Sequence, residues 1–247
     1  MVPEEFQAEN KLAPLTQSEV PLAAASGHPA ESLTEDFALA LLTSRELLAE
    51  EIAQISRNVG VMKSRKVRVA LAAHARTPRR IALRLIRELY TGDLLQFSLT
   101  PGVMTDLKRV ADELLISRLA SLSLGERIAL GRRSSAMVVA ALLLDKESRV
   151  WQTALENPRL SEAAIVRALQ RPMAGAAFVE AVCHHKKWSF RPEIRVALLR
   201  NAHTPLARAL EFARRIPPAQ LSDILHASRL PEKIKSYLRR DSEMKGK

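Results

Sequence analysis

The chain has 247 residues and a formal net charge of +11, and Ala, Leu and Arg dominate a composition in which aromatic residues make up only 4%. These are strong helix formers, so the composition favours an α-helical fold over a β-rich one. A single cysteine, Cys183, excludes an internal disulfide framework, and no apolar run reaches the roughly 18 residues of a membrane span. Glu4, Glu5 and Glu9 stand where a signal peptide would be positively charged, so a cytoplasmic protein without membrane association is expected.

Charge is distributed unevenly along the chain. Residues 1–62 hold 3 basic and 10 acidic residues, a net charge of −7, and the other 35 basic and 17 acidic residues give +18. Residues 1–31 also contain scattered prolines and no periodic apolar pattern, so we predict a disordered acidic segment there. Order is expected from residue 32, because Ser32 and Glu35 have the spacing of a capping box. Residues 242–247 are predicted to form a disordered tail.

The region between these ends, residues 32–241, repeats itself. A shift of 127 residues aligns 33–90 on 160–217 without a gap, and "DLLQFSLTP" at 93–101 then matches "DILHASRLP" at 223–231 after an insertion of three residues. A spacing of 127 corresponds to three units of about 42 residues, which is in the range of helical repeat proteins. The segment "ALENPRLSEAAIVRAL" in the middle unit is a third and looser version of "LLRNAHTPLARAL".

Each of the two closer copies contains a Thr-Pro step between two apolar helical patterns. Thr77 and Thr204 are suited to be N-caps, with Pro78 and Pro205 at the first helical position, where the missing N–H has no partner to lose. The pattern predicts two antiparallel helices joined by a tight turn. Because one such pair cannot bury its apolar stripe alone, we predict an all-α fold: a right-handed α-solenoid of about five stacked antiparallel helix pairs.

With these residues in view, the chain resembles the HEAT-like and leucine-rich-repeat-variant α-solenoids of bacteria, whose units often read "VRxALxxNPxTP". The resemblance covers roughly residues 33–241 and implies a HEAT-like superhelix. One leucine-rich-repeat-variant type carries an iron–sulfur cluster. Such a cluster needs several thiolates, and Cys183 is the only cysteine, so this feature does not carry over and no cofactor is expected.

Basic residues gather between positions 63 and 90, where nine positive charges face Glu88 alone. A solvated helix face more usually intersperses acids among its cations. The face has three interpretations: a binding surface for phosphates or an acidic partner, a docking surface for the chain's own acidic segment, or an incidental basic surface. The candidate binding residues are Lys63, Arg65, Lys66, Arg76, Arg80, Arg84 and Arg87.

Other conspicuous residues have structural interpretations. Arg68 and Arg195 occupy matching positions in the two copies, and we expect them to bind helix carbonyls or to pair between repeats. Cys183, His184 and His185 are adjacent, and adjacent side chains diverge on a helix, so no metal site is predicted. We expect Cys183 in a helix core and Trp188 between repeats.

No common enzyme signature occurs in the sequence, and no catalytic residue is proposed. The favoured function is a non-catalytic scaffold that binds a protein partner. One alternative is nucleic-acid binding, extending to glycosylase-like chemistry, for which the available acids and aromatic residues include Asp112, Asp145, Trp151 and Trp188. The other alternative is a structural or assembly protein.

Overall fold

The structure, a computed structural model, describes residues 33–44 and 46–245. The predicted acidic segment at residues 1–31 and Ser32 of the predicted capping box lie outside the described residues. The first helix begins at Glu35, and Thr34 is its N-cap, accepting a hydrogen bond from the Phe37 N–H at 3.3 Å.

The described part of the chain is all-helical, as predicted, and contains no β-strand. A 3₁₀ turn at Leu119–Ser121 follows the seventh helix. The α-helices are α1 (Glu35–Thr43), α2 (Ala49–Arg57), α3 (Val59–Met62), α4 (Arg65–Ala73), α5 (Arg79–Glu88), α6 (Thr91–Leu99), α7 (Thr105–Arg118), α8 (Leu124–Arg133), α9 (Ala136–Leu142), α10 (Ser148–Leu155), α11 (Glu162–Gln170), α12 (Ala176–His184), α13 (Pro192–Leu199), α14 (Leu206–Ala213), α15 (Pro218–His226) and α16 (Glu232–Lys245).

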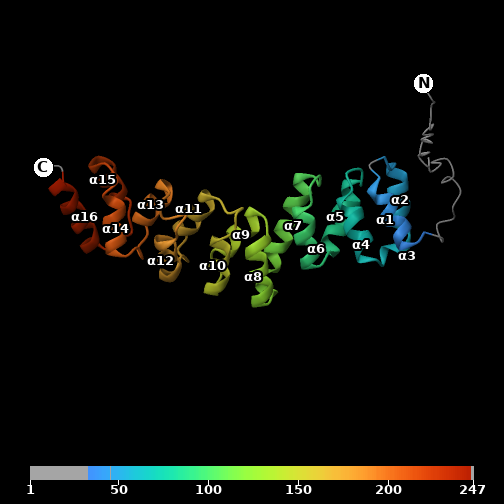
Figure 1. The fold of residues 1–247 in the computed structure, drawn as a ribbon, viewed down its shortest axis with the longest axis horizontal. Coiled ribbons are helices and arrows are strands. Elements are labelled where there is room, and N and C mark those ends of the chain that lie inside the picture. Colours follow the sequence, from blue (N-terminus) through green and yellow to red (C-terminus); the bar gives the residue numbers. More distant parts are fainter. Residues whose placement is uncertain (1–32, 45, 246–247) are drawn as a thin grey trace, which may run out of the picture.

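The helices follow one another along an elongated body, with α1 at one end and α16 at the other (Figure 1). Their main contacts join helices that are close in the chain: α4 packs on α1, α5 and α6, and α5 packs on α7. The apolar side chains that these contacts bury run from Ala38 in α1 to Leu238 in α16. Burial of this apolar surface is the main favourable contribution to folding.

The helix boundaries repeat at a shift of 127 residues. Under this shift α1, α2, α6 and α7 coincide at both ends with α11, α12, α15 and α16, and α4 and α5 begin where α13 and α14 begin. We call residues 33–118 the first copy and residues 160–245 the second copy. Because α6 falls on α15 without a gap, the three-residue insertion expected from the sequence is wrong.

Contacts between helices repeat as well. In the second copy α13 packs on α11, α14 and α15, and α14 packs on α16, as their counterparts do in the first copy. Helices α8 to α10 lie between the copies, with α9 joining α7 to α11 and α10 contacting α12. Helix α16 extends through residues 242–245, beyond the predicted end of the solenoid at 241.

The Thr-Pro steps act differently from the prediction. The Thr77 hydroxyl donates to the Leu71 carbonyl at 2.6 Å, and the Thr204 hydroxyl donates to the Leu198 carbonyl at the same distance. Pro78 and Pro205 are themselves the N-caps of α5 and α14, so the expected N-cap role of the threonines and first-turn position of the prolines are wrong. The buried threonine hydroxyls instead donate to carbonyls near the end of the preceding helix, which also accept the backbone N–H groups of His74 and Asn201.

A second set of hydrogen bonds joins each part of the helical body to the part that precedes it in the chain. Asn157 Nδ2 donates to the Gly131 carbonyl at 2.8 Å, and Asn201 Nδ2 donates to the Leu169 carbonyl at 2.7 Å. Through Oδ1, each asparagine also accepts the N–H of the residue two positions later. Carbonyls 29 to 33 residues earlier in the chain are likewise reached by side-chain atoms of His74, Trp188 and Ser228.

Candidate functional site

Two of the seven basic candidates are used inside the fold. Arg76 donates to the Glu46 and Leu47 carbonyls at 3.1 and 3.4 Å, just before α2 begins. Arg65 pairs with the buried Asp93 of α6, with 2.5 Å between Nε and Oδ2, and this bond raises the pKa of Arg65. These two arginines hold neighbouring segments together.

The other five candidates are exposed, and none of them forms an ion pair with another described residue. The structure brings only two of the five into one cleft, where they line the space between α3 and α5. The three that lie outside this cleft are Lys66, Arg80 and Arg87, and the two that line it are Lys63 and Arg84.

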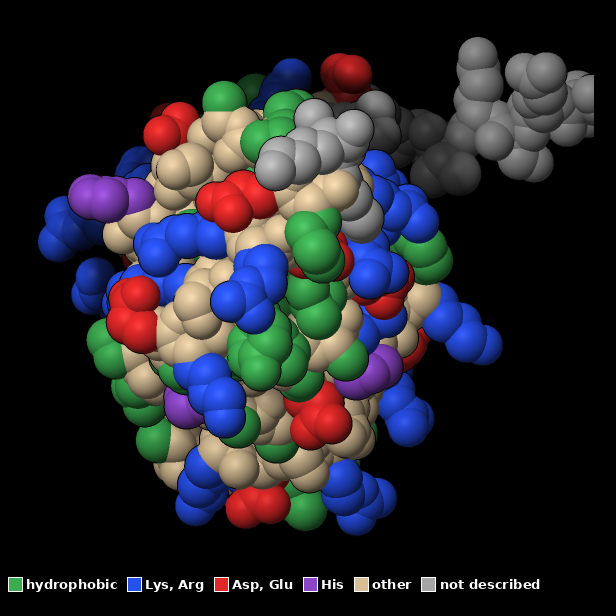
Figure 2. Space-filling view, turned by 90° about the vertical axis from the view of Figure 1, so that its left-hand side faces the viewer, with side chains coloured by type: hydrophobic (Ala, Val, Ile, Leu, Met, Phe, Trp, Pro, Cys, Tyr) green, Lys and Arg blue, Asp and Glu red, His purple; other side chains and the backbone are tan. Residues whose placement is uncertain are grey.

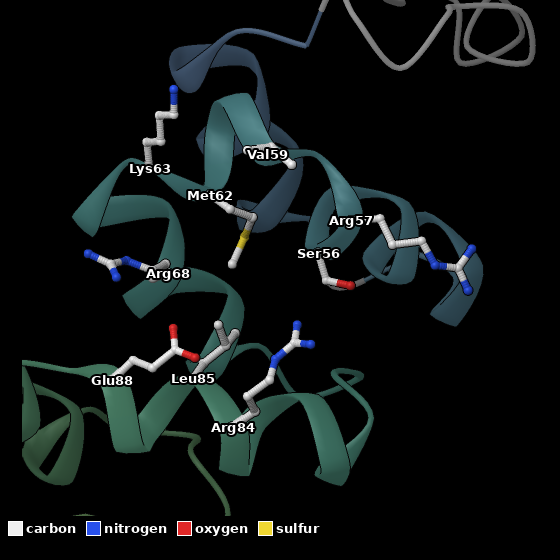
Figure 3. A pocket seen from close by; sticks show the side chains of 9 residues that line it. All are labelled: Ser56, Arg57, Val59, Met62, Lys63, Arg68, Arg84, Leu85 and Glu88. Carbon is white, nitrogen blue, oxygen red and sulfur yellow. The ribbon is translucent and has the colours of Figure 1, made fainter.

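The cleft has a volume of about 360 Å³ and is open to solvent. We call it the Arg68 cleft. Figure 3 shows Met62 and Arg84 pointing into the space between α3 and α5, with Arg68 on the other side of Met62 from Arg84. Its lining residues are Ser56, Arg57, Val59, Met62, Lys63, Arg68, Arg84, Leu85 and Glu88.

Two capping residues position α3, whose side chains line one side of the cleft. Asn58 ends α2 and caps the short α3, its Oδ1 accepting the N–H groups of Gly60 and Val61 at 2.9 and 3.2 Å. Ser64 then caps α4 by accepting the Val67 N–H at 3.4 Å. The two closely spaced caps turn the chain sharply between α2 and α4 and place α3 above α5.

The cleft is electropositive and its cations are unpaired. Four cationic side chains line it, on Arg57, Lys63, Arg68 and Arg84, against the single carboxylate of Glu88. In the described residues no carboxylate lies within ion-pair distance of these four. Arg68 Nε is buried and has no hydrogen-bond partner within this part of the chain. A buried donor without an acceptor carries a desolvation cost, which a ligand atom accepting its hydrogen would remove.

Sequence reasoning missed half of the cationic lining. Arg57 lies outside the basic stretch at 63–90, and Arg68 was given a structural role because its counterpart Arg195 shares its position. Arg195 does have such a role: it is buried, and its Nε donates to the Ser189 carbonyl at 2.8 Å. Burial lowers the pKa of Arg195, and the nearby Arg215 lowers it further. The two matching arginines therefore have different surroundings.

The acids and aromatic residues considered for base chemistry do not meet in a cleft. Asp112 is buried and accepts a hydrogen bond from Ser135 at 2.7 Å, while Asp145 pairs with the buried Arg127 at 3.3 Å. Trp151 is buried and packs edge-on against an aromatic ring at 5.7 Å. Trp188 is also buried, and its Nε1 donates to a backbone carbonyl. Each of these four side chains is engaged in packing.

The cysteine and histidines of α12 also diverge. Cys183 is fully buried, and burial raises the pKa of its thiol to about 12. His184 is exposed beside the Glu180 carbonyl, whereas His185 accepts the Lys187 N–H at 3.1 Å through Nδ1. Among the residues that the structure describes, no group of three or more His, Cys, Asp and Glu side chains is arranged to hold a metal ion.

A second and smaller cleft, of about 250 Å³, lies at the end of α10. It is lined by Arg132, Thr153, Glu156 and Asn157. Asn157 already makes its two hydrogen bonds within the fold, and the cleft has one cation against one carboxylate. This smaller cleft therefore lacks the excess of positive charge that distinguishes the Arg68 cleft.

A scan against protein-family models, a search of curated proteins and a search of solved structures each gave no match to this chain. Within residues 33–44 and 46–245, no helix combines the length and the apolarity needed to cross a bilayer.

Proposed function

We propose that this protein is a non-catalytic binding scaffold: a right-handed α-solenoid of HEAT-like helix pairs that holds a protein partner on the side of the Arg68 cleft. In such a fold each helix pair contacts mainly its neighbours, so that side chains from successive pairs line an extended surface. The repeated contacts and the bridging hydrogen bonds of Asn157 and Asn201 support this arrangement.

The observation that carries the function is the mixed lining of the Arg68 cleft. Unpaired cations surround apolar side chains, among them Val59, which is 74% exposed, and Met62. Phosphate recognition relies on cations and hydrogen-bond donors, whereas protein interfaces combine an apolar centre with a polar rim. The Arg68 cleft, with apolar side chains among cations, has the composition of a protein interface.

Charge of mixed sign at the α16 end of the body supports a protein partner over nucleic acid at that end (Figure 2). Figure 2 shows the face at the α16 end of the body, where lysines and arginines are scattered and acidic side chains lie between them. Arg79 pairs with Asp106, which removes one more cation from the basic stretch. Nucleic-acid binding draws on a basic patch or stripe that follows the phosphates.

Affinity capture from a lysate of the source cells, with and without nuclease, tests the proposal. We expect a partner protein to be retained after nuclease treatment and to be lost from the variant Arg84→Glu. Captured material that disappears with nuclease would contradict the protein-scaffold function and favour nucleic-acid binding. A nuclease-resistant partner retained by Arg84→Glu would keep the scaffold function and place its interface elsewhere.

A further inference from the structure

The second copy fills the space that is open in the first. Arg195, the counterpart of Arg68, lies between the rings of Phe190 and Phe212, at 5.8 and 5.7 Å from their centroids. Its Nε donates to the Ser189 carbonyl at 2.8 Å. Arg195 thus packs against two aromatic rings of its own chain, and its buried donor is satisfied.

The first copy lacks both aromatic rings. Under the shift of 127 residues, Lys63 stands in place of Phe190 and Leu85 in place of Phe212. Arg68 Nε is buried without a hydrogen-bond partner in the described residues, and the cleft of about 360 Å³ lies above it. The same helix framework therefore has a filled site in one copy and a vacant one in the other.

Charge differs between the copies in the same place. Glu211 of the second copy pairs with Arg208, which also donates to the Cys183 carbonyl and packs over Phe212 at 5.1 Å. In the first copy Arg84 replaces Glu211. The vacant site thus gains a cation where the filled site has a carboxylate, and the cation has no ion-pair partner within the described chain.

From this comparison we infer that the Arg68 cleft binds an acidic peptide segment of a partner protein. A carboxylate of the segment pairs with Arg84, which points into the cleft, in the region where the second copy carries Glu211 and Phe212. An apolar side chain of the segment packs on Val59 and Met62. The inference rests on the proposed function and names the chemistry of its partner.

Two features of the lining select a peptide over a free polyanion. Glu88 repels phosphates and peptide carboxylates alike, but it can accept hydrogen bonds from the backbone N–H groups of a peptide, which a free polyanion does not offer. The apolar side chains of Val59, Met62 and Leu85 make no favourable contact with phosphates. A Leu or Ile side chain of a peptide, in contrast, gains a binding free energy of roughly 25 cal/mol per Å² of apolar surface that it buries there.

The test is fluorescence anisotropy with the full chain and a fluorescein-labelled peptide of repeating Asp-Glu-Leu. The double variant Lys63→Phe, Leu85→Phe installs the two rings of the second copy and is expected to abolish binding. The second copy carries phenylalanine at both equivalent positions, but Leu85 is buried, so the fold of the variant is checked directly. Far-ultraviolet circular dichroism and the melting temperature confirm that the variant is folded.

A pair of charge-reversal variants separates the cleft from general electrostatics. Arg84→Glu copies the residue of the second copy and is expected to weaken peptide binding about tenfold or more, since a charge-assisted hydrogen bond is lost and repulsion is added. Lys146→Glu changes net charge equally at an exposed site outside the cleft and is expected to change affinity by less than about twofold.

Equal weakening by both charge reversals, or unchanged binding by the double variant, would overturn the inference. Duplex DNA that competes with the peptide for the wild-type protein, and that no longer binds the variant Arg84→Glu, would overturn it too.

A variant in which the glutamates of residues 1–31 are replaced by glutamine serves as a further control. Tighter peptide binding by this variant would assign the cleft to the chain's own segment and contradict a partner protein. A nuclease-resistant partner that still binds when the peptide does not would leave the scaffold function standing without the inference.

Discussion

At the scale of single residues, the fold depends on side chains that satisfy carbonyls at helix ends. Asn157 and Asn201 each donate to a carbonyl of the preceding helix pair and accept an N–H of their own turn. The hydroxyls of Thr77 and Thr204 donate to the carbonyls of Leu71 and Leu198 in the turns that follow α4 and α13. Buried carbonyls without a partner are costly, so these residues define the spacing of the helices as well as the turns.

Removing one of these bridges should destabilise the protein measurably. Asn201→Ala leaves the Leu169 carbonyl without its partner, and we expect the free energy of unfolding to fall by about 1–3 kcal/mol. Urea denaturation followed by circular dichroism measures the change. The exposed Gln152→Ala is the matched control and should shift stability by less than about 0.5 kcal/mol. A loss no larger than that of the control would show that Asn201 does not hold the two helices together.

Residue identity alone did not reveal what these side chains do. A threonine before a proline has the composition of an N-cap, and the sequence interpretation assigned it that way. In the structure the same hydroxyl turns back to the helix that precedes it, because Pro78 and Pro205 take the N-cap positions. The choice between two helix ends depends on backbone geometry that the pattern does not encode.

At the scale of helices, the repeat was predictable and its details were not. The apolar periodicity and the shift of 127 predicted the helical elements, and α4, α5, α13 and α14 lie where the repeated segments are. The three-residue insertion was wrong because Pro101 and Pro231, in the loops that follow α6 and α15, were aligned with each other instead of the helix ends. Asp93 and Asp223, matched by that alignment, differ accordingly: Asp93 is buried on Arg65 and Asp223 is exposed.

Packing between helices also sets the ionisation of Asp112 in α7. Burial raises the pKa of this carboxyl above its ordinary value of 3.8, against the opposing effect of its hydrogen bond from Ser135. A carboxyl whose pKa is higher in the folded than in the unfolded state binds more protons when folded. Its effect on stability is therefore most favourable below the unfolded-state pKa and is lost as pH rises through the folded-state pKa.

This sign gives a prediction for Asp112→Asn. The amide keeps a hydrogen-bond acceptor for Ser135 but has no charge to desolvate, so stability should depend less on pH over the range just above 3.8. Chemical denaturation of the wild type and the variant at a series of pH values measures the difference. Parallel curves for the two proteins across that range would contradict a raised pKa at Asp112.

At the scale of the whole molecule, contacts run mainly between neighbours along the elongated body (Figure 1). Stability in such an architecture is close to a sum of local and nearest-neighbour contributions, so damage in one region remains local. The Arg68 cleft shows why a candidate binding site in an elongated helical body is hard to find from sequence. Arg57 and Arg84 come from helices α2 and α5, and only packing brings them to one space.

The variant Phe212→Ala tests how locally stability is determined. Phe212 is fully buried in α14, and its truncation should cost about 3–5 kcal/mol. Hydrogen–deuterium exchange should show protection falling in α13 to α16 while α4 to α7 keep theirs. Loss of protection along the whole chain would mean that the helices form one cooperative core and would contradict a solenoid.

The central claim is that one framework has been used twice, filled by its own side chains around Arg195 and left open to a partner around Arg68. A crystal structure of the full chain with the Asp-Glu-Leu peptide tests it most directly. The account predicts a peptide carboxylate within hydrogen-bond distance of the Arg84 guanidinium in the Arg68 cleft, and the rings of Phe190 and Phe212 beside Arg195. An Arg68 cleft occupied by side chains of its own chain, with the peptide bound elsewhere, would contradict it.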